Sequence, residues 1–327
     1  MTSAAATVTA SPPSEVVAAH ARLGWRSAIA AAVMVTLLRP ATWVVALAGF
    51  LAGGGIAILA WPILVLPTMS GLQNILGAPV STLAFGNPSS ELIEFVVGTT
   101  IGGVVALVAG LFTGAWAERR GIELVLAGAA DEGYAAPARS LRGAPGPARI
   151  AVLRATALIP PLIVGALAWP TLYNVTYKEL ILPEDLATPL PVRVIAQVPA
   201  LLGLLLASWI LADAAAAVGV RRLVVERRGL ARAWALGWVD LVRRAHRLVP
   251  IAVLGTLALA LAAGPALIAA AIAWVRVREA LELSEGGLVG IVVVALWVAI
   301  WLGSVVLAGV GAAIRAALFT MEGARRR

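Results

Sequence analysis

Few residues of this chain combine a reactive side chain with a placement that suggests chemistry. Asp213, in the apolar segment SWILADAAAAVG, is the one ionisable residue that lies away from the ends of the long apolar runs. A carboxylate in such surroundings serves as a proton relay or cation ligand, or forms a structural ion pair. Arg154 and Arg315 are candidate partners, because both are expected near the same end of the runs. We favour the structural pair, since a relay needs further acids at depth and the runs contain none.

Other sources of chemistry are scarce. His20 and His246 both fall in predicted surface helices, where a solvated side chain is the simpler interpretation. The chain has no cysteine and no HExxH, GxSxG or P-loop pattern, so we predict no catalytic residue, no cofactor and no metal site. A polar segment around Lys178 could bind a ligand, but an ordered loop with interfacial tyrosines is the preferred interpretation.

The composition indicates a membrane protein. The chain is 61% hydrophobic and 13% charged, far outside the range of soluble globular domains. A sequence pI near 11.2 could suggest nucleic acid, but the arginines cluster beside apolar runs and no nucleic-acid-binding motif accompanies them. The near absence of lysine, with abundant Ala, Gly, Pro and Val, is typical of a bacterium with GC-rich genes.

The apolar runs predict an all-α protein with six transmembrane helices. Each run has about 20 residues or more, which a hydrocarbon core of roughly 30 Å requires. Backbone groups without water must bond internally, so the runs must be helical. We expect three hairpins, together with amphipathic surface helices on the cytoplasmic side. The predicted spans are Trp43–Leu66, Ile93–Trp116, Ile150–Leu172, Val194–Val218, Leu248–Val275 and Leu288–Ala312.

The segments outside the spans complete the predicted organisation. Residues 1–14 read as a disordered tail, 15–318 as a single six-helix domain and 319–327 as a basic C-terminal tail. Within the domain, a stripe of apolar residues from Glu15 to Leu38 predicts a surface helix that stops at Arg39-Pro40.

The distribution of positive charge predicts the orientation. Of the 25 Lys and Arg residues, 21 fall on the side of the termini and four on the other side. Lys and Arg are enriched in cytoplasmic loops. We therefore expect a multi-pass protein of the bacterial cytoplasmic membrane with both termini in the cytoplasm.

The connector Arg221–Pro250 holds eight of the 25 basic residues between two predicted spans. Apolar residues recur within it three or four positions apart, which predicts a basic amphipathic helix in the headgroup layer. Anionic lipid headgroups are the expected partner. The candidate lipid contacts are Arg227, Arg228, Trp234, Trp238, Arg243 and Arg244.

Small residues predict how the spans pack. Glycines four residues apart allow close approach of two helix backbones, which drives association where hydrophobicity cannot. The candidates are Gly49, Gly53, Gly98, Gly102, Gly110 and Gly114. Prolines interrupt several runs, and broken helices can expose carbonyl groups at a transporter's binding site. These prolines are Pro62, Pro160, Pro161, Pro199 and Pro265.

Two family resemblances rest on the connector. The stretch GLARAWALGWVDLVRRAHRLVPIAVL, with Leu38-Arg39-Pro40 before the first span, resembles a group of bacterial six-helix membrane proteins. That group includes the membrane domain attached to glycerophosphodiester phosphodiesterases, and its members are mostly without assigned activity. The resemblance covers Arg26 to Arg315 and implies six spans with cytoplasmic termini, but no phosphodiesterase catalytic domain is present.

The second resemblance is to the coupling loop of ABC importer permeases, in which a glycine precedes a proline by thirteen residues. Gly237 and Pro250 occupy those places, after Ala231-Arg232-Ala233, but the glutamate of the pattern is absent. It would imply an ATPase partner. Our leading hypothesis is a non-enzymatic membrane protein with a scaffolding, assembly or membrane-organising role, and the alternative is the permease subunit of a transporter.

Overall fold

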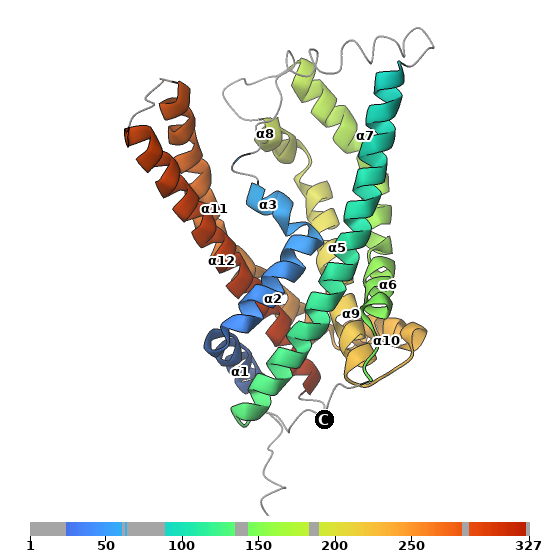
Figure 1. Cartoon of the computed structure of the whole chain (residues 1–327). Coiled ribbons are helices and arrows are strands. Elements are labelled where there is room, and N and C mark those ends of the chain that lie inside the picture. Colours follow the sequence, from blue (N-terminus) through green and yellow to red (C-terminus); the bar gives the residue numbers. More distant parts are fainter. Residues whose placement is uncertain are drawn as a thin grey trace, which may run out of the picture.

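The computed structural model describes residues 24–60, 63, 89–134, 143–182, 190–282 and 288–324. In these parts the chain is helical, without strands, and six of its helical segments are long and apolar enough to cross a membrane. The predicted all-α fold class and the number of spans are therefore confirmed. The fold defines an α-helical, multi-pass membrane protein, shown in Figure 1.

The first part of the chain is a short helix followed by a broken span. Helix α1 (Trp25–Leu38) ends where Pro40 begins α2 (Pro40–Phe50), as expected for a residue whose fixed φ suits the first helical turn. A π-helical turn, Leu51–Gly55, then separates α2 from α3 (Ile56–Ala60). Gly54 takes a φ of 95°, a left-handed conformation that favours glycine. The predicted span Trp43–Leu66 corresponds to the candidate span Pro40–Ala60, in which the turn at Gly54 bends the helix; residues 61, 62 and 64–66 lie outside the described part.

Helices α5, α11 and α12 extend beyond the predicted spans, whereas the predicted spans Ile150–Leu172 and Val194–Val218 are each divided between two helices, at Leu158 and at Val198. Because polar residues can continue a helix into the headgroup layer, hydropathy alone underestimates the lengths of α5, α11 and α12. The bounds of the remaining elements are α5 Ser90–Asp131, α6 Pro147–Ala157, α7 Ile159–Ile181, α8 Leu190–Gln197, α9 Pro199–Val224, α10 Leu230–Arg243, α11 Ala245–Glu282 and α12 Leu288–Ala324.

The C-terminal boundary of the predicted domain also needs correction. Residues 319–324 are the last turns of α12 and not a tail, since Phe319, Thr320, Met321 and Glu322 are buried against neighbouring helices. The predicted tail at 1–14 and residues 325–327 lie outside the described part.

Packing is concentrated at one end of the helix assembly. The buried residues of α5 run from Ala115 to Ala129, those of α9 from Ala212 to Val224, and those of α12 from Ser304 to Glu322. At the other end these helices diverge, with α11 and α12 on one side and α5 on the other (Figure 1). The core therefore lies in the half that contains the C-terminus.

The predicted packing glycines divide into two groups. A methyl group added at Gly110 would lie 2.7 Å from the carbonyl oxygen of Ala52, and one at Gly49 would lie 3.3 Å from Cβ of Ala117. These residues bring α5 against the first span, and Gly114 lies beside Ala52 as well. For Gly53, Gly98 and Gly102, no atom of the described residues lies within 4 Å of the place that an added methyl group would take, so their packing role stays a prediction.

Candidate functional site

Five charged side chains from four helices meet in the packed half. We call them the ion-pair network: Glu118 on α5, Arg154 on α6, Asp213 and Arg221 on α9, and Arg315 on α12. The long sequence separations mean that only the tertiary fold brings them together. Their side chains keep between 7% and 26% of their accessible surface.

Arg154 is the centre of the network. Its Nε and Nη2 donate to the two carboxylate oxygens of Glu118 at 2.7 Å each, the paired geometry that makes arginine–carboxylate contacts strong. Its Nη1 donates to Oδ1 of Asp213 at 2.6 Å, and Arg315 donates to the other oxygen of Asp213. The structure therefore places Asp213 between both of its predicted partners.

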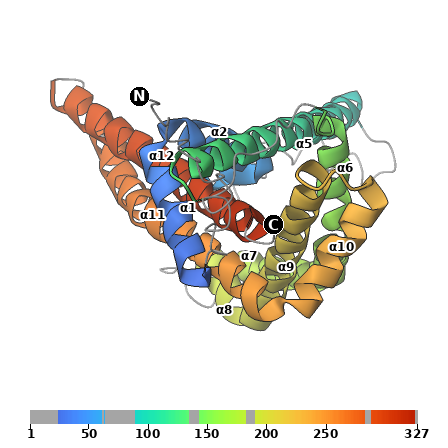
Figure 2. The same cartoon turned by 90° about the horizontal axis from the view of Figure 1, so that it is seen from below.

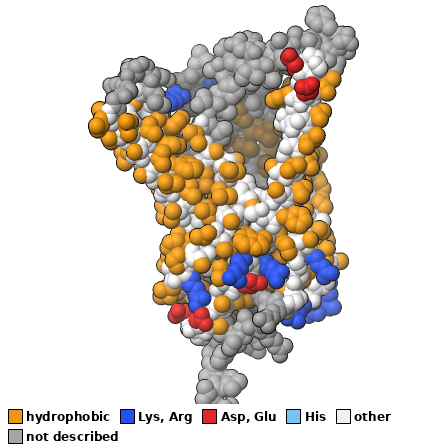
Figure 3. Space-filling view, viewed as in Figure 1, with side chains coloured by type: hydrophobic (Ala, Val, Ile, Leu, Met, Phe, Trp, Pro, Cys, Tyr) orange, Lys and Arg blue, Asp and Glu red, His pale blue; other side chains and the backbone are white. Residues whose placement is uncertain are grey.

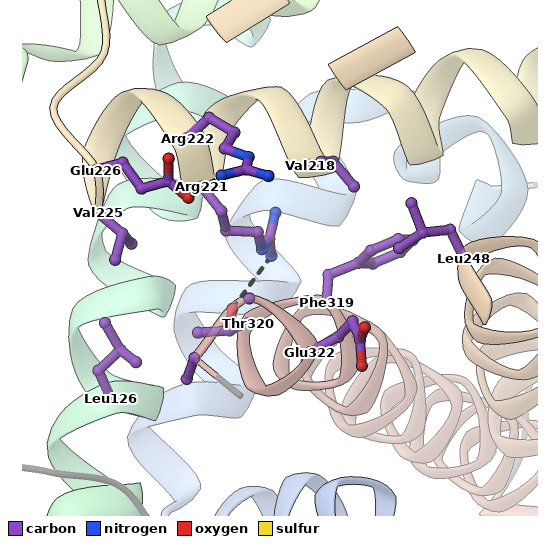
Figure 4. Close-up of a pocket in the computed structure, with 12 residues that line it drawn as sticks. Leu126, Val218, Arg221, Arg222, Val225, Glu226, Leu248, Phe319, Thr320 and Glu322 are labelled. Carbon is purple, nitrogen blue, oxygen red and sulfur yellow. Dashed lines mark hydrogen bonds and ion pairs between the residues drawn. The ribbon is translucent and has the colours of Figure 1, made fainter. Parts of the chain in front are cut away.

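Arg221 connects the network to the end of α12. Its Nη1 donates to Glu118 at 2.9 Å, and its Nη2 donates to the hydroxyl of Thr320 at 3.2 Å. The guanidinium lies over the ring of Phe319, 5.6 Å from the ring centroid, which favours a cation. Figure 4 shows Arg221 extending from α9 toward Thr320 at the edge of a pocket of about 30 Å³. A pocket of that size holds on the order of one water molecule.

Sequence reasoning missed Glu118, Arg221 and Thr320 as members of this site. Glu118 lies two residues beyond the predicted end of the second span, and Arg221 was grouped with the lipid-facing connector. A charge count was the available signal: Asp213 alone cannot balance two arginines in an apolar environment, so a second acid at the same depth is required.

Arginines neutralise both acids of the network. Both oxygens of Asp213 and both oxygens of Glu118 accept hydrogen bonds from guanidinium groups. Among the described residues, no group of three His, Cys, Asp or Glu side chains could hold a metal ion. The arrangement binds four helices together.

The predicted connector Arg221–Pro250 comprises the end of α9, a turn, the helix α10 and the first residues of α11. Ala233, Gly237, Asp240 and Leu241 form the buried face of α10, which packs on α9. Asp240 accepts from the Nη2 and Nε atoms of Arg222 on α9, at 2.7 and 3.1 Å. Figure 2 shows α10 at the rim of the assembly beside α9.

The predicted lipid contacts are in different environments. Trp234 keeps 39% of its surface, whereas Trp238 packs against the hydrophobic core. Gly237 and Leu241 on the same helix are buried and so are not available to lipid. Small residues allow that part of the helix to dock on α9 instead. Arg227 and Arg243 are exposed. Arg228 lies 3.5 Å from Glu226, and Arg244 lies 3.6 Å from Asp240, but their side chains remain 43% and 41% exposed.

At the opposite end of the assembly, α7 and α8 are held together by a buried acid. Glu179 keeps 1% of its side-chain surface and accepts from Nε of Arg193 at 2.8 Å. Gln197 also donates to Glu179, and Nη2 of Arg193 donates to the backbone oxygen of the same residue at 3.0 Å. Lys178 itself lies in α7 and not in a loop, and residues 183–189 of the polar segment lie outside the described part.

These observations define the class of protein: an α-helical protein with six membrane-spanning candidates, held together at one end by an ion-pair network. Scans of protein-family models, curated proteins and solved structures found no match to this chain.

Proposed function

We propose that this chain is a non-catalytic protein of the bacterial cytoplasmic membrane that organises anionic lipid, or partner proteins, at the cytoplasmic surface. The orientation follows from charge. Blue side chains gather at the lower end of the face in Figure 3, the end at which the C-terminus lies in Figure 1, and apolar side chains cover the region above. The positive-inside rule assigns that end to the cytoplasm.

The sole lysine tests this orientation. Lys178 is exposed near the end of α7 opposite the ion-pair network. We expect a membrane-impermeant amine reagent, added outside intact cells, to modify Lys178, with the site identified by peptide mapping. The N-terminal amine should react only after the cells are permeabilised. If the N-terminal amine reacted in intact cells and Lys178 only after permeabilisation, the topology would be the reverse of the proposed one and α10 would not lie at the cytoplasmic surface.

The observation that carries the proposal is the arrangement of side chains around α10. One face packs on α9, so lipid cannot be its partner there. Trp234, Trp238 and Val242 follow one another at four-residue spacing along the adjacent side, and Val242 is 77% exposed. Arg232 and Arg243 are exposed three turns apart on a further side. A helix with a docked face, an aromatic side and a basic side suits the boundary between acyl chains and anionic headgroups.

Replacing the four predicted contacts Arg227, Arg228, Arg243 and Arg244 by glutamine should weaken association with phosphatidylglycerol by about 1 kcal/mol per charge near the surface. The measurement is the affinity of the full chain for spin-labelled phosphatidylglycerol relative to phosphatidylcholine. The preference should also fall at high salt, because exposed charges are screened. Replacing Arg276 and Arg278 by glutamine at the opposite end is the matched control. Equal lipid preference in both variants would exclude anionic lipid as the partner.

The permease subunit is the second candidate function. The break in the first span at Gly54 favours it, because interrupted helices are typical of transporter binding sites. A permease of the importer type would retain an ATPase after mild detergent extraction. A stoichiometric ATPase in the purified complex would favour this candidate over the first. Membership of the bacterial six-helix group that the connector resembles is also part of our proposal, and it is compatible with either function.

A further inference from the structure

The part of α9 from Asp213 to Arg221 contacts the ion-pair network on one side and α10 on the other. Asp213 and Arg221 begin and end this stretch and face α6, α5 and α12. Between them, Ala215 and Gly219 form the surface on which α10 packs. Helix α10, which we expect at the lipid headgroups, is therefore separated from the ion-pair network by the width of α9 alone.

The contact between α9 and α10 is close. A methyl group added at Gly237 of α10 would lie 2.5 Å from the carbonyl oxygen of Ala215 and 3.3 Å from Cα of Gly219. A methyl group added at Gly219 would in turn lie 3.2 Å from the carbonyl oxygen of Ala233 on α10 and 3.3 Å from the side chain of Leu153 on α6. Leu153 precedes Arg154, so packing connects α10 to the central arginine through one glycine.

Charge connects the same elements. The consecutive residues Arg221 and Arg222 leave α9 in different directions: Arg221 donates to Glu118 in the network, and Arg222 donates to Asp240 on α10. Figure 4 shows the two side chains diverging from adjacent positions. Moving α10 away would remove Asp240 as an acceptor of Arg222 and leave it with Glu226, which follows α9, so the side chain next to Arg221 would change its contacts.

The helix that carries Arg154 has a break beside it. Helix α6 ends at Ala157 and α7 begins at Ile159, with Leu158 between them. Pro160 and Pro161 lack an amide hydrogen, so they cannot donate to the carbonyl groups of Thr156 and Ala157. The orientation of α6 is therefore set by its contacts with α5, α9 and α10 and less by continuity with α7.

We propose that α10 is a lipid-controlled clamp on the ion-pair network. With α10 seated in anionic headgroups and docked on α9, α6 is held in place and Arg154 bridges Glu118 and Asp213. When α10 leaves α9, α6 turns at Leu158 and Arg154 separates from Asp213. This inference rests on the proposed lipid function and adds a conformational response to it.

The natural absence of cysteine allows two reporters to be placed in the full chain. Spin labels at Val152→Cys on α6 and Val306→Cys on α12 measure the movement of α6, and both positions are exposed. A bimane label at Val242→Cys, in a separate variant, reports the environment of α10. The spin-label distance and the bimane emission are measured in two kinds of nanodisc, one of phosphatidylcholine alone and one of a one-to-one mixture with phosphatidylglycerol. Each measurement is repeated in a protein that also carries Gly237→Ala. Gly203→Ala, on α9 itself and with no described atom within 4 Å of the added methyl group, is the control.

We expect one narrow distance distribution in the mixed bilayer, and a broader and longer one in phosphatidylcholine or with Gly237→Ala. The bimane emission should shift to the blue in the mixed bilayer, and Gly203→Ala should match the parent. A blue shift without any change in the spin-label distance overturns the clamp but leaves the lipid function intact. No bimane response to phosphatidylglycerol overturns the lipid function itself. A distance change in Gly203→Ala equal to that in Gly237→Ala would contradict the role of α10 docking.

Discussion

Replacing Arg154 by methionine should lower the free energy of unfolding by about 3–5 kcal/mol, the cost of breaking a buried ion pair by removing one partner. Arg154 donates three hydrogen bonds to two carboxylates. Methionine fills a similar volume but leaves Glu118 and Asp213 without their common partner in an apolar region. The measurement is steric trapping of the unfolded state in bicelles, or a denaturant titration in detergent where unfolding is reversible.

Arg120→Met is the matched control for this prediction. Arg120 lies on α5 and pairs with Glu123 at 3.0 Å, but its side chain is 53% exposed. An exposed pair contributes about 0–1 kcal/mol, so the control should remain close to the parent. Similar losses for the two arginines would mean that the ion-pair network has no special role in stability.

A double-mutant cycle separates the network from general damage. If Arg154 and Asp213 act through their mutual contact, the combined variant Arg154→Met with Asp213→Asn should be less damaging than the sum of the single variants. Coupling between residues in one network is typically about 0.5–3 kcal/mol. Strict additivity would show that Arg154 acts through Glu118 alone.

The sequence predicts the helices far better than their contacts. The requirement for about 20 apolar residues per span is local, so composition and run length identify six spans without knowledge of the tertiary fold. The ends are less predictable, because Glu118 and Glu322 are charged and yet belong to continuous helices. The charge of Glu118 is tolerated through its contacts with Arg154 and Arg221, which are distant in the sequence and which no local window contains.

Part of the candidate site could be predicted, because one of its residues gives a local signal. An isolated acid in an apolar run demands a partner, so Asp213 directs attention to Arg154 and Arg315. Nothing in the connector indicates, however, that Arg221 faces inward while Arg222 faces α10, because both lie in the same basic segment. Glycine spacing is similarly ambiguous: Gly98–Gly102 and Gly110–Gly114 have the same pattern, and only the path of the first span distinguishes them.

Gly311→Ala should lower the free energy of unfolding by about 1–3 kcal/mol, the usual cost of overpacking a close contact. A methyl group at this position would lie 2.6 Å from Cα of Leu259 on α11, and 3.2 Å from the backbone oxygen of Ala258. These are backbone atoms, which cannot turn aside as a flexible side chain can, so α11 and α12 must separate along their shared interface.

Gly303→Ala on the same helix is the control for that substitution. No described atom lies within 4 Å of the added methyl group, so only helix propensity changes, with a gain of up to about 1 kcal/mol. The two variants therefore have opposite expected signs in one denaturation series. A stable Gly311→Ala variant would show that α11 and α12 can move apart without cost. Arg315 lies one turn further along α12, and its contact with Asp213 depends on the same packing. A stable variant would therefore also argue against the view that contacts in the packed half fix the relative positions of these spans.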